Sequence, residues 1–397
     1  MNDVVIVAAC RTAIGNMGGS LKTFEAVDIT MPVMQNLVKR AGIDPDLIED
    51  VIWGCNYQKT YRENNLARVA AVRAGLPITV PGITLHRNCT SSMSAAQMGY
   101  YQIKAGEAEV LMVGGADSMS NASFTVEKMR WGARLGHSEV RDSMWDSLTN
   151  TGIGPAMGIT AENVAAKFNI SREQQDELAY LSHKRAVQAI DDGKFKEEII
   201  PLEIKERKKP VWIFDTDERP RRNIDLEELS KMKPAYKEGG SVTAGNASGI
   251  NDGASGLILM SANKAKELGM SVMGRIVSTA TAGVDPDIMG IGPVPSSRMA
   301  LKKAGLTWDD IELIEVNEAF AAQYLACEKE LGLNRAITNI NGSGISLGHP
   351  VGCTGTRIIT TLLYEMKRQK LKYGLATLCA GGGMGTAIIV ERDPQFI

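Results

Sequence analysis

Cys89 is the residue whose surroundings in this sequence best suit a nucleophile. An apolar, strand-like run at residues 83–85 ends just before it, and a helical run of apolar and small residues follows at 93–105, up to Gly106. Unpaired N–H groups and the dipole at a helix start stabilise an anion, so this position predicts a thiol more acidic than usual. The alternative is an inert, buried cysteine, which Cys89 taken alone does not exclude.

Two motifs near the C-terminus offer partners for such a thiol. His349 lies in a glycine-dense loop, residues 341–352, where the backbone can approach a ligand closely. Cys379 ends a strand-like run and precedes three glycines that begin at Gly381, and their N–H groups could form an oxyanion hole. A structural histidine and a buried structural thiol are the respective alternatives.

Asn317 stands between a strand-like run at 311–316 and a helical run at 319–331. It could present an amide to a site, but a simple helix N-cap is the alternative. The glycines after Cys379 are not followed by Lys-Ser or Lys-Thr, so they do not indicate a phosphate-binding Walker loop.

The elements that must position these residues follow an α/β pattern that occurs twice. Ala41-Gly42-Ile43 recurs as Ala304-Gly305-Leu306, and the segment beginning at Ile48 recurs from Ile311, each offset by 263 positions (304 − 41 and 311 − 48). This repeat predicts two similar halves packed together, so that one site can draw residues from both. Gly54 then corresponds to Asn317.

The expected elements can be given by range. In the first half we expect strands at 4–9, 51–53, 83–85 and 110–114 with helices at 26–40, 64–73 and 93–105. In the second half we expect strands at 275–277, 311–316 and 337–341, two more ending at 390, and helices at 296–303, 319–331 and 356–366. Between them a helix is expected at 171–191, with Ser171 as its N-cap and Gln174 completing a capping box.

Four segments follow as predicted domains. Residues 1–118 and 244–271 would form the N-terminal half, 119–243 an inserted loop domain, and 272–397 the C-terminal half.

Composition narrows the class of protein. The 397 residues carry a formal net charge of −2 and a pI near 6.2, which argues against a nucleic-acid binder. Six cysteines without a CxxC pair indicate reduced thiols. No basic region precedes the first apolar run, and no run is long enough to span a membrane, so a cytoplasmic protein is expected.

The four motifs, in this order and over essentially the whole chain, resemble the thiolase family. Further segments that resemble it are 157–163 (MGITAEN), 242–249 (VTAGNASG) and 348–350 (GHP). The resemblance implies the thiolase fold, an α/β architecture in which two βαβαβαββ halves form a five-layered α/β/α/β/α sandwich. It also implies that the inserted loop domain helps to bind coenzyme A, and that the protein is a homo-oligomer, a tetramer or a dimer, with tetramer contacts near residues 121–139.

The resemblance implies a role for each motif. Cys89 would carry the acyl group, His349 would accept its proton, and Cys379 would act as acid and then as base. His349 and a water held by Asn317 would form one oxyanion hole, and the N–H groups of Cys89 and Gly381 another. The residues expected around coenzyme A and the acyl group are Leu148, Met157, Arg221, Tyr236, Ala244, Ser248, Met289 and Phe320. No metal and no cofactor is expected, because coenzyme A thioesters are the substrates.

The implied reaction is the reversible condensation of two acetyl-CoA molecules to acetoacetyl-CoA and coenzyme A, within fatty-acid metabolism. A thiolase for longer 3-ketoacyl-CoA substrates is the nearest alternative, because Ala156 stands where short-chain members often carry histidine. A Cys-His acyl-CoA hydrolase, which would give Cys379 no task, is an alternative from another class. A non-catalytic binding protein on the same scaffold is a third.

Overall fold

The computed structural model describes residues 3–59, 62–149, 151–205 and 210–392. Its first half is built on strands that lie in the order β4 (Gly82–Leu85), β3 (Asp50–Gly54), β5 (Val110–Ser118), β11 (Asn251–Ser261) and β1 (Val4–Thr12). β3 runs parallel to both of its neighbours, whereas β11 is antiparallel to β5 and to β1.

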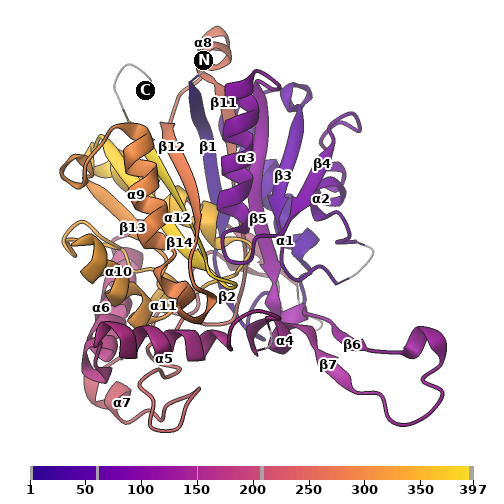
Figure 1. Ribbon diagram of the computed structural model, residues 1–397. Coiled ribbons are helices and arrows are strands. Elements are labelled where there is room, and N and C mark those ends of the chain that lie inside the picture. Colours follow the sequence, from indigo (N-terminus) through magenta and orange to yellow (C-terminus); the bar gives the residue numbers. More distant parts are fainter. Residues whose placement is uncertain (1–2, 60–61, 150, 206–209, 393–397) are drawn as a thin grey trace.

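The second half continues from the edge of the first. Its strands lie in the order β12 (Gly274–Gly283), β15 (Met384–Glu391), β14 (Tyr373–Ala380) and β13 (Leu313–Val316). β1 pairs antiparallel with β12 through Val4, Val5 and Ile6, so the two sheets join at this edge (Figure 1).

Helices cover both sheets and also separate them. The outer helices are α1 (Ala26–Ala41) and α2 (Leu66–Ala74) on the first sheet, and α9 (Pro293–Ala304) and α10 (Ala321–Leu331) on the second. Between the sheets lie α3 (Ser91–Ala105) and α12 (Thr354–Gln369), which share one apolar core with both. α12 is buried without interruption over 354–366, as a helix between two layers must be. This is the five-layered arrangement that was predicted.

The internal repeat is confirmed in detail. α1 and α9 each end at a glycine in the left-handed region, Gly42 (φ 66°) and Gly305 (φ 70°), where a residue with a Cβ would be strained. A short 3₁₀ turn and then a strand, β3 or β13, follow each glycine. Glu49 accepts from the Val110 N–H at 2.9 Å, and its counterpart Glu312 accepts from the Tyr373 N–H at 3.2 Å.

The strand expected at 337–341 is wrong. That segment makes only an isolated bridge between Thr338 and Ile314, and Asn339 then turns the chain with a φ of 49°. The Asn339 side chain takes the place of a strand partner, because it accepts from the Val316 N–H and donates to the Val316 carbonyl, each at 2.8 Å. An amide side chain that mimics a peptide group leaves no strand pattern in the sequence.

Residues between β5 and β11 form the inserted segment. The expected helix is α6 (Arg172–Asp191), and its capping box between Ser171 and Gln174 is present. The other elements are the hairpin of β6 (Phe124–Val126) and β7 (Val140–Asp142), helices α4 (Ser143–Thr149), α5 (Met157–Phe168) and α7 (Leu226–Ser230), and short strands β8 (Ile199–Ile200), β9 (Leu202–Ile204) and β10 (Trp212–Phe214). The division into domains at 118, 243 and 271 stays a prediction.

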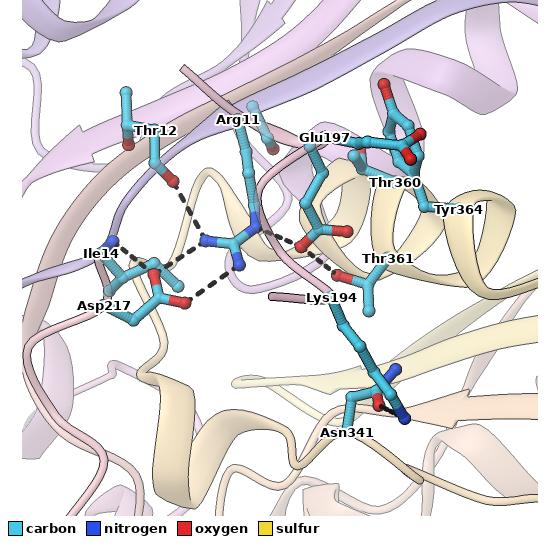
Figure 2. Close-up of polar contacts among 12 residues, drawn as sticks. Arg11, Thr12, Ile14, Lys194, Glu197, Asp217, Asn341, Thr360, Thr361 and Tyr364 are labelled. Carbon is cyan, nitrogen blue, oxygen red and sulfur yellow. Dashed lines mark hydrogen bonds and ion pairs between the residues drawn. The ribbon is translucent and has the colours of Figure 1, made fainter. Parts of the chain in front are cut away.

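A buried arginine ties this segment to both halves. Arg11, near the end of β1, donates to Glu198 at 2.7 Å. It also donates to both oxygens of Asp217, at 2.8 and 3.0 Å (Figure 2). Asp217 also accepts from the Ile14 N–H at 2.8 Å, and Glu198 accepts from Thr361 of α12 at 3.0 Å. Displacement of the inserted segment would leave a buried charge without its partner, which is costly, so this network holds the segment in place.

None of the helices in the described ranges is long and apolar enough to span a bilayer.

Candidate active site

Cys89 lies in the turn between β4 and α3, with Thr90 as the N-cap of the helix. It is partly exposed, whereas the other five cysteines are buried. The expected acidic thiol is wrong for the resting protein, because burial raises the pKa of Cys89 to about 11 while the N–H groups of Gly381 and of Cys89 itself act against the rise. The helix start tolerates an anion here but does not by itself create one.

His349 presents an unpaired nitrogen to the site. Thr354 Oγ1 donates to the Pro350 carbonyl at 2.7 Å, so its lone pair is left to accept from His349 Nδ1 at 2.6 Å. We assign the proton to Nδ1 on this basis, which makes Nε2 an acceptor. Nε2 is buried and has no hydrogen-bond partner among the described residues. Burial first, and then the Arg357 charge, lower the pKa of His349 to about 3, so the imidazole rests neutral.

Asn317 comes from the second half, at the end of β13. Its N–H donates to the Thr377 carbonyl at 3.0 Å, and its side-chain Nδ2 lies 3.4 Å from Nδ1 of His349. Its Oδ1 is buried and is unpaired within the described part of the chain. The corresponding residue of the first half, Gly54, cannot carry such a group, because a Cβ there would lie 2.7 Å from the Ser91 Cβ.

Cys379 lies at the end of β14 in an apolar cluster that includes Met157, Met289 and Phe320. Burial raises the pKa of this thiol well above its ordinary value, and the neighbouring Cys89 contributes in the same direction. Cys379 is therefore a neutral thiol close to Cys89 in the resting protein.

A cavity of about 200 Å³ brings most of the expected residues together. Cys89 from the first half and His349 from the second both line it, together with residues of α4 and α5, which lie beneath the strand ends in Figure 1. The expected ligand contacts that line it are Leu148, Met157, Tyr236, Ser248, Met289 and Phe320.

A second cavity, of about 230 Å³, lies beside the first. It shares Cys89, Leu148 and Met157 with the first cavity and adds Asn88 and Gly381. A Cβ at Gly381 would lie 3.0 Å from the Met157 sulfur, so a glycine suits this approach.

Two expected contacts lie apart from both cavities. Ala244 and Arg221 are exposed and line neither of them. The backbone N–H of Arg221 donates to His183 at 3.1 Å, and Arg221 itself is exposed to solvent.

Comparison with known proteins identifies the family. The models of the thiolase N-terminal domain and the thiolase C-terminal domain match residues 4–263 and 270–392. The chain belongs to the thiolase family.

Relatives of this thiolase match it over nearly their full length. The acetyl-CoA acetyltransferase of Pseudomonas aeruginosa is 48% identical, covering 99% of this chain and 100% of that protein. The crystal structure of the Bacillus anthracis acetyl-CoA acetyltransferase superposes with a TM-score of 0.96 at 49% identity, covering 98% of this chain and 99% of that one. Human mitochondrial 3-ketoacyl-CoA thiolase in complex with CoA gives 0.95 at 41% identity, covering 99% and 98%.

Three side chains that orient the site of this thiolase were missed in the sequence. Thr354 fixes the His349 ring as described, and Asn251 Oδ1 accepts from the His349 N–H at 3.0 Å. Asp117 joins the two halves, since it accepts from the Gly352 N–H at 2.5 Å and from the Asn56 N–H at 2.8 Å. Asn251 and Asp117 act across sequence separations of 98 and 235 residues. Thr354 is only five residues from His349, but the loop must fold before the two side chains meet.

The pH dependence of alkylation tests the resting state of this site. The pKa of Cys89, raised to about 11, and that of His349, lowered to about 3, both favour a resting pair of neutral side chains over a thiolate–imidazolium pair. Without substrate, iodoacetamide should therefore modify Cys89 about tenfold faster for each pH unit from about pH 7 to about pH 9. Intact mass after short exposures measures this, because the other cysteines are buried. A plateau below about pH 8 would instead indicate a thiolate–imidazolium pair.

Proposed function

We propose that this thiolase is an acetyl-CoA C-acetyltransferase, which condenses two acetyl-CoA molecules to acetoacetyl-CoA and coenzyme A and catalyses the reverse thiolysis. The observation that carries the proposal is a small cavity lined by Cys89 and by His349, whose Nε2 is unpaired within the described residues, with a second thiol close behind its wall. That thiol is Cys379, which is buried against Met289 and Phe320 of the cavity wall and interacts with Cys89. One thiol and one base suffice for hydrolysis, whereas a second thiol gives a condensing enzyme its carbon base. The names of the relatives support the same activity.

In the proposed acylation, the Cys89 sulfur attacks the thioester carbon while its proton passes to His349 Nε2. The two pKa values make prior ionisation costly, so the proton transfer accompanies the attack. The N–H groups of Cys89 and Gly381 stabilise the oxyanion. The bond to the coenzyme A sulfur then breaks, and Cys379 gives its proton to the leaving thiolate.

In the proposed condensation, the Cys379 thiolate left by that step removes a proton from the α-carbon of a second acetyl-CoA. The apolar surroundings that raise its pKa make it a stronger base, which so weak a carbon acid requires. His349 and a water held by Asn317 stabilise the enolate, and the two unpaired buried atoms, Nε2 and Oδ1, are suited to such partners. The carbanion attacks the acyl carbon, and the departing Cys89 sulfur recovers its proton from His349.

Coenzyme A would reach Cys89 along the cavity walls formed by the inserted segment. The rings of Tyr236 and Phe320 meet edge to face at 6.1 Å between their centroids. Gly158 permits this, because a Cβ there would lie 2.1 Å from the Tyr236 ring. Arg221 and Ala244 are proposed for the solvent-exposed nucleotide end, where a flexible guanidinium can pair with phosphate.

The acyl preference is the first test. The cavity must hold the end of the pantetheine arm as well as the acyl group, and Met289 and Phe320 close it. Thiolysis of acetoacetyl-CoA should therefore be about tenfold or more faster, in kcat/KM, than thiolysis of a medium-chain 3-ketoacyl-CoA, since overpacking costs roughly 1–3 kcal/mol. Equal or faster thiolysis of the longer chain would favour the alternative of a longer-chain 3-ketoacyl-CoA thiolase.

We also propose that the protein is a homo-oligomer, most simply a tetramer. The β6–β7 hairpin projects from the body of the molecule (Figure 1) and carries Phe124, Trp131 and Leu135, which are 65%, 81% and 100% exposed. Large apolar side chains grouped in solvent indicate an interaction surface. The outer edge of β4 is also open, and an edge strand can pair with a second copy.

Charges on the hairpin should therefore reduce the assembly. The double variant Trp131→Glu and Leu135→Glu is expected to lower the mass measured by light scattering from tetramer to dimer, because a buried charge without a partner is costly. Met299→Glu, on the outer helix α9, introduces a single glutamate at an apolar residue that is 42% exposed, and it should not change the mass. An unchanged mass in the double variant would contradict the role of the hairpin.

A cytoplasmic enzyme of fatty-acid metabolism, without a metal or another cofactor, completes the proposal. The six free cysteines support a reducing compartment.

A further inference from the structure

Asn88, the residue before Cys89, makes a contact that the proposed mechanism does not use. Its side-chain Nδ2 donates to the carbonyl oxygen of Gly381 at 2.7 Å, between residues that are 293 positions apart. The loop that carries the nucleophile and the glycine loop after β14 are thus joined by one side-chain hydrogen bond. Asn88 also lines the cavity of about 230 Å³ beside Cys89.

The backbone of Asn88 is itself held in one conformation. Its φ is 47°, a left-handed value that asparagine adopts more readily than most other residues with a Cβ. Its carbonyl accepts from the Ser91 N–H at 3.0 Å and from the Ser91 hydroxyl at 2.7 Å. The Asn88 side chain therefore extends from a backbone that is held in place. Its hydrogen bond to Gly381 restrains the glycine loop, and the loop does not determine the position of Asn88.

The position of the glycine loop matters because the loop supplies a backbone N–H group, that of Gly381, to the site. Gly381 and Cys89 line the same cavity, and the backbone N–H groups of both lower the pKa of the Cys89 thiol against the effect of burial, so each favours the anion. Flanking glycines give this loop freedom, since Gly382 and Gly383 have φ values of 83° and 81°. Hydrogen-bond donors stabilise a developing charge fully only when they are held in place before it develops.

We propose that Asn88 is a positioning residue that clamps the Gly381 loop to the Cys89 turn, so that both N–H donors stay aimed at the reacting sulfur and the oxyanion beside it. The proposal deepens the proposed function and rests on it for the acyl-transfer step. The effect on the thiolate itself needs no substrate and can be measured separately.

Two variants separate the amide from the backbone. Asn88→Gly keeps the left-handed conformation but has no side chain, and Asn88→Asp keeps the shape but replaces the N–H donor by a carboxylate oxygen. Asn169→Gly is the matched control, because Asn169 is also left-handed, at φ 53°, and is exposed at the end of α5. It should behave like the parent.

The first measurement is alkylation of Cys89 by iodoacetamide, followed by intact mass without substrate. Both Asn88 variants should react several-fold more slowly than the parent near neutral pH, since the thiolate loses a well-placed donor. The second measurement is the rate of acyl-enzyme formation with acetyl-CoA, which should fall about 10- to 100-fold, while KM stays within about twofold. Loss of a whole oxyanion donor costs about 10²–10³ in rate, which sets the upper limit.

Acid rescue distinguishes the clamp from a general weakening of the fold. When the carboxyl of Asn88→Asp is protonated it can again donate to Gly381, so its acylation rate relative to Asn88→Gly should rise as the pH falls from about 8 to about 5. A structural defect would give no such rise.

Parent-like alkylation and acylation in Asn88→Gly would overturn the clamp, as would equal pH profiles for the two variants. If the parent formed no acyl adduct while the variants still alkylated more slowly, the clamp would stand and the proposed function would fail.

Discussion

Replacement of Cys89 by serine is expected to lower kcat for condensation and for thiolysis by roughly 10⁴- to 10⁶-fold, the range found when an enzyme loses its covalent nucleophile. Serine is slightly smaller than cysteine and fits the turn, so the defect should be chemical. Its hydroxyl is far less acidic than a thiol, and a neutral His349 with a pKa of about 3 is too weak a base to compensate. Steady-state assays in both directions measure the loss.

Cys10→Ala is the matched control for this variant. Cys10 is a buried thiol in β1 whose Sγ lies 3.6 Å from the Val33 carbonyl, and the proposed chemistry does not involve it. Its removal should cost some stability, about 1 kcal/mol for a small cavity, but leave kcat unchanged. Two results together would rule out the acyl-Cys89 intermediate. The Cys89→Ser variant would keep more than about one hundredth of the parental kcat, and the parent would carry no adduct after incubation with acetyl-CoA.

The helices and strands of the two similar halves could be predicted because their signals are local. Gly42 and Gly305 mark helix ends by a conformation that glycine favours, and the apolar runs that follow predict strands wherever they occur. The prediction failed at 337–341, where Asn339 replaces backbone pairing by a side-chain amide. No periodicity records a contact of that kind.

The candidate site could be predicted in its members but not in its electrostatics. Cys89 and Asn317 each lie at an element end that the sequence indicates, His349 lies in a loop that its glycines mark, and the motifs resemble those of one family. The pKa of Cys89 was expected to fall, yet burial by residues distant in sequence raises it to about 11. The tautomer of His349 depends likewise on Thr354, which only the folded loop brings to 2.6 Å.

Replacement of Cys379 by alanine is expected to separate the two half-reactions. Condensation should fall by roughly 10³-fold, within the range of 10²–10⁴ for loss of a general acid–base group. Among the described residues, the first cavity is lined by no carboxyl and by no thiol except that of Cys89, so no group there can replace Cys379 as the base. Acylation of Cys89 by acetyl-CoA should continue at a reduced rate, since coenzyme A must then leave without a proton from Cys379. Intact mass should therefore show the acyl-enzyme accumulating.

Cys327→Ala is the matched control, because Cys327 is also a buried thiol near Cys379 but belongs to another apolar cluster, where its Sγ donates to the Gly290 carbonyl at 3.3 Å. It should lose stability to a similar extent and keep its condensation rate. Undiminished turnover in Cys379→Ala, with release of free acid from acyl-CoA, would instead identify a Cys-His hydrolase that needs no second thiol. The buried Cys379 thiol is thus the residue on which the choice between condensation and hydrolysis depends, since Cys89 and His349 would serve either reaction equally well.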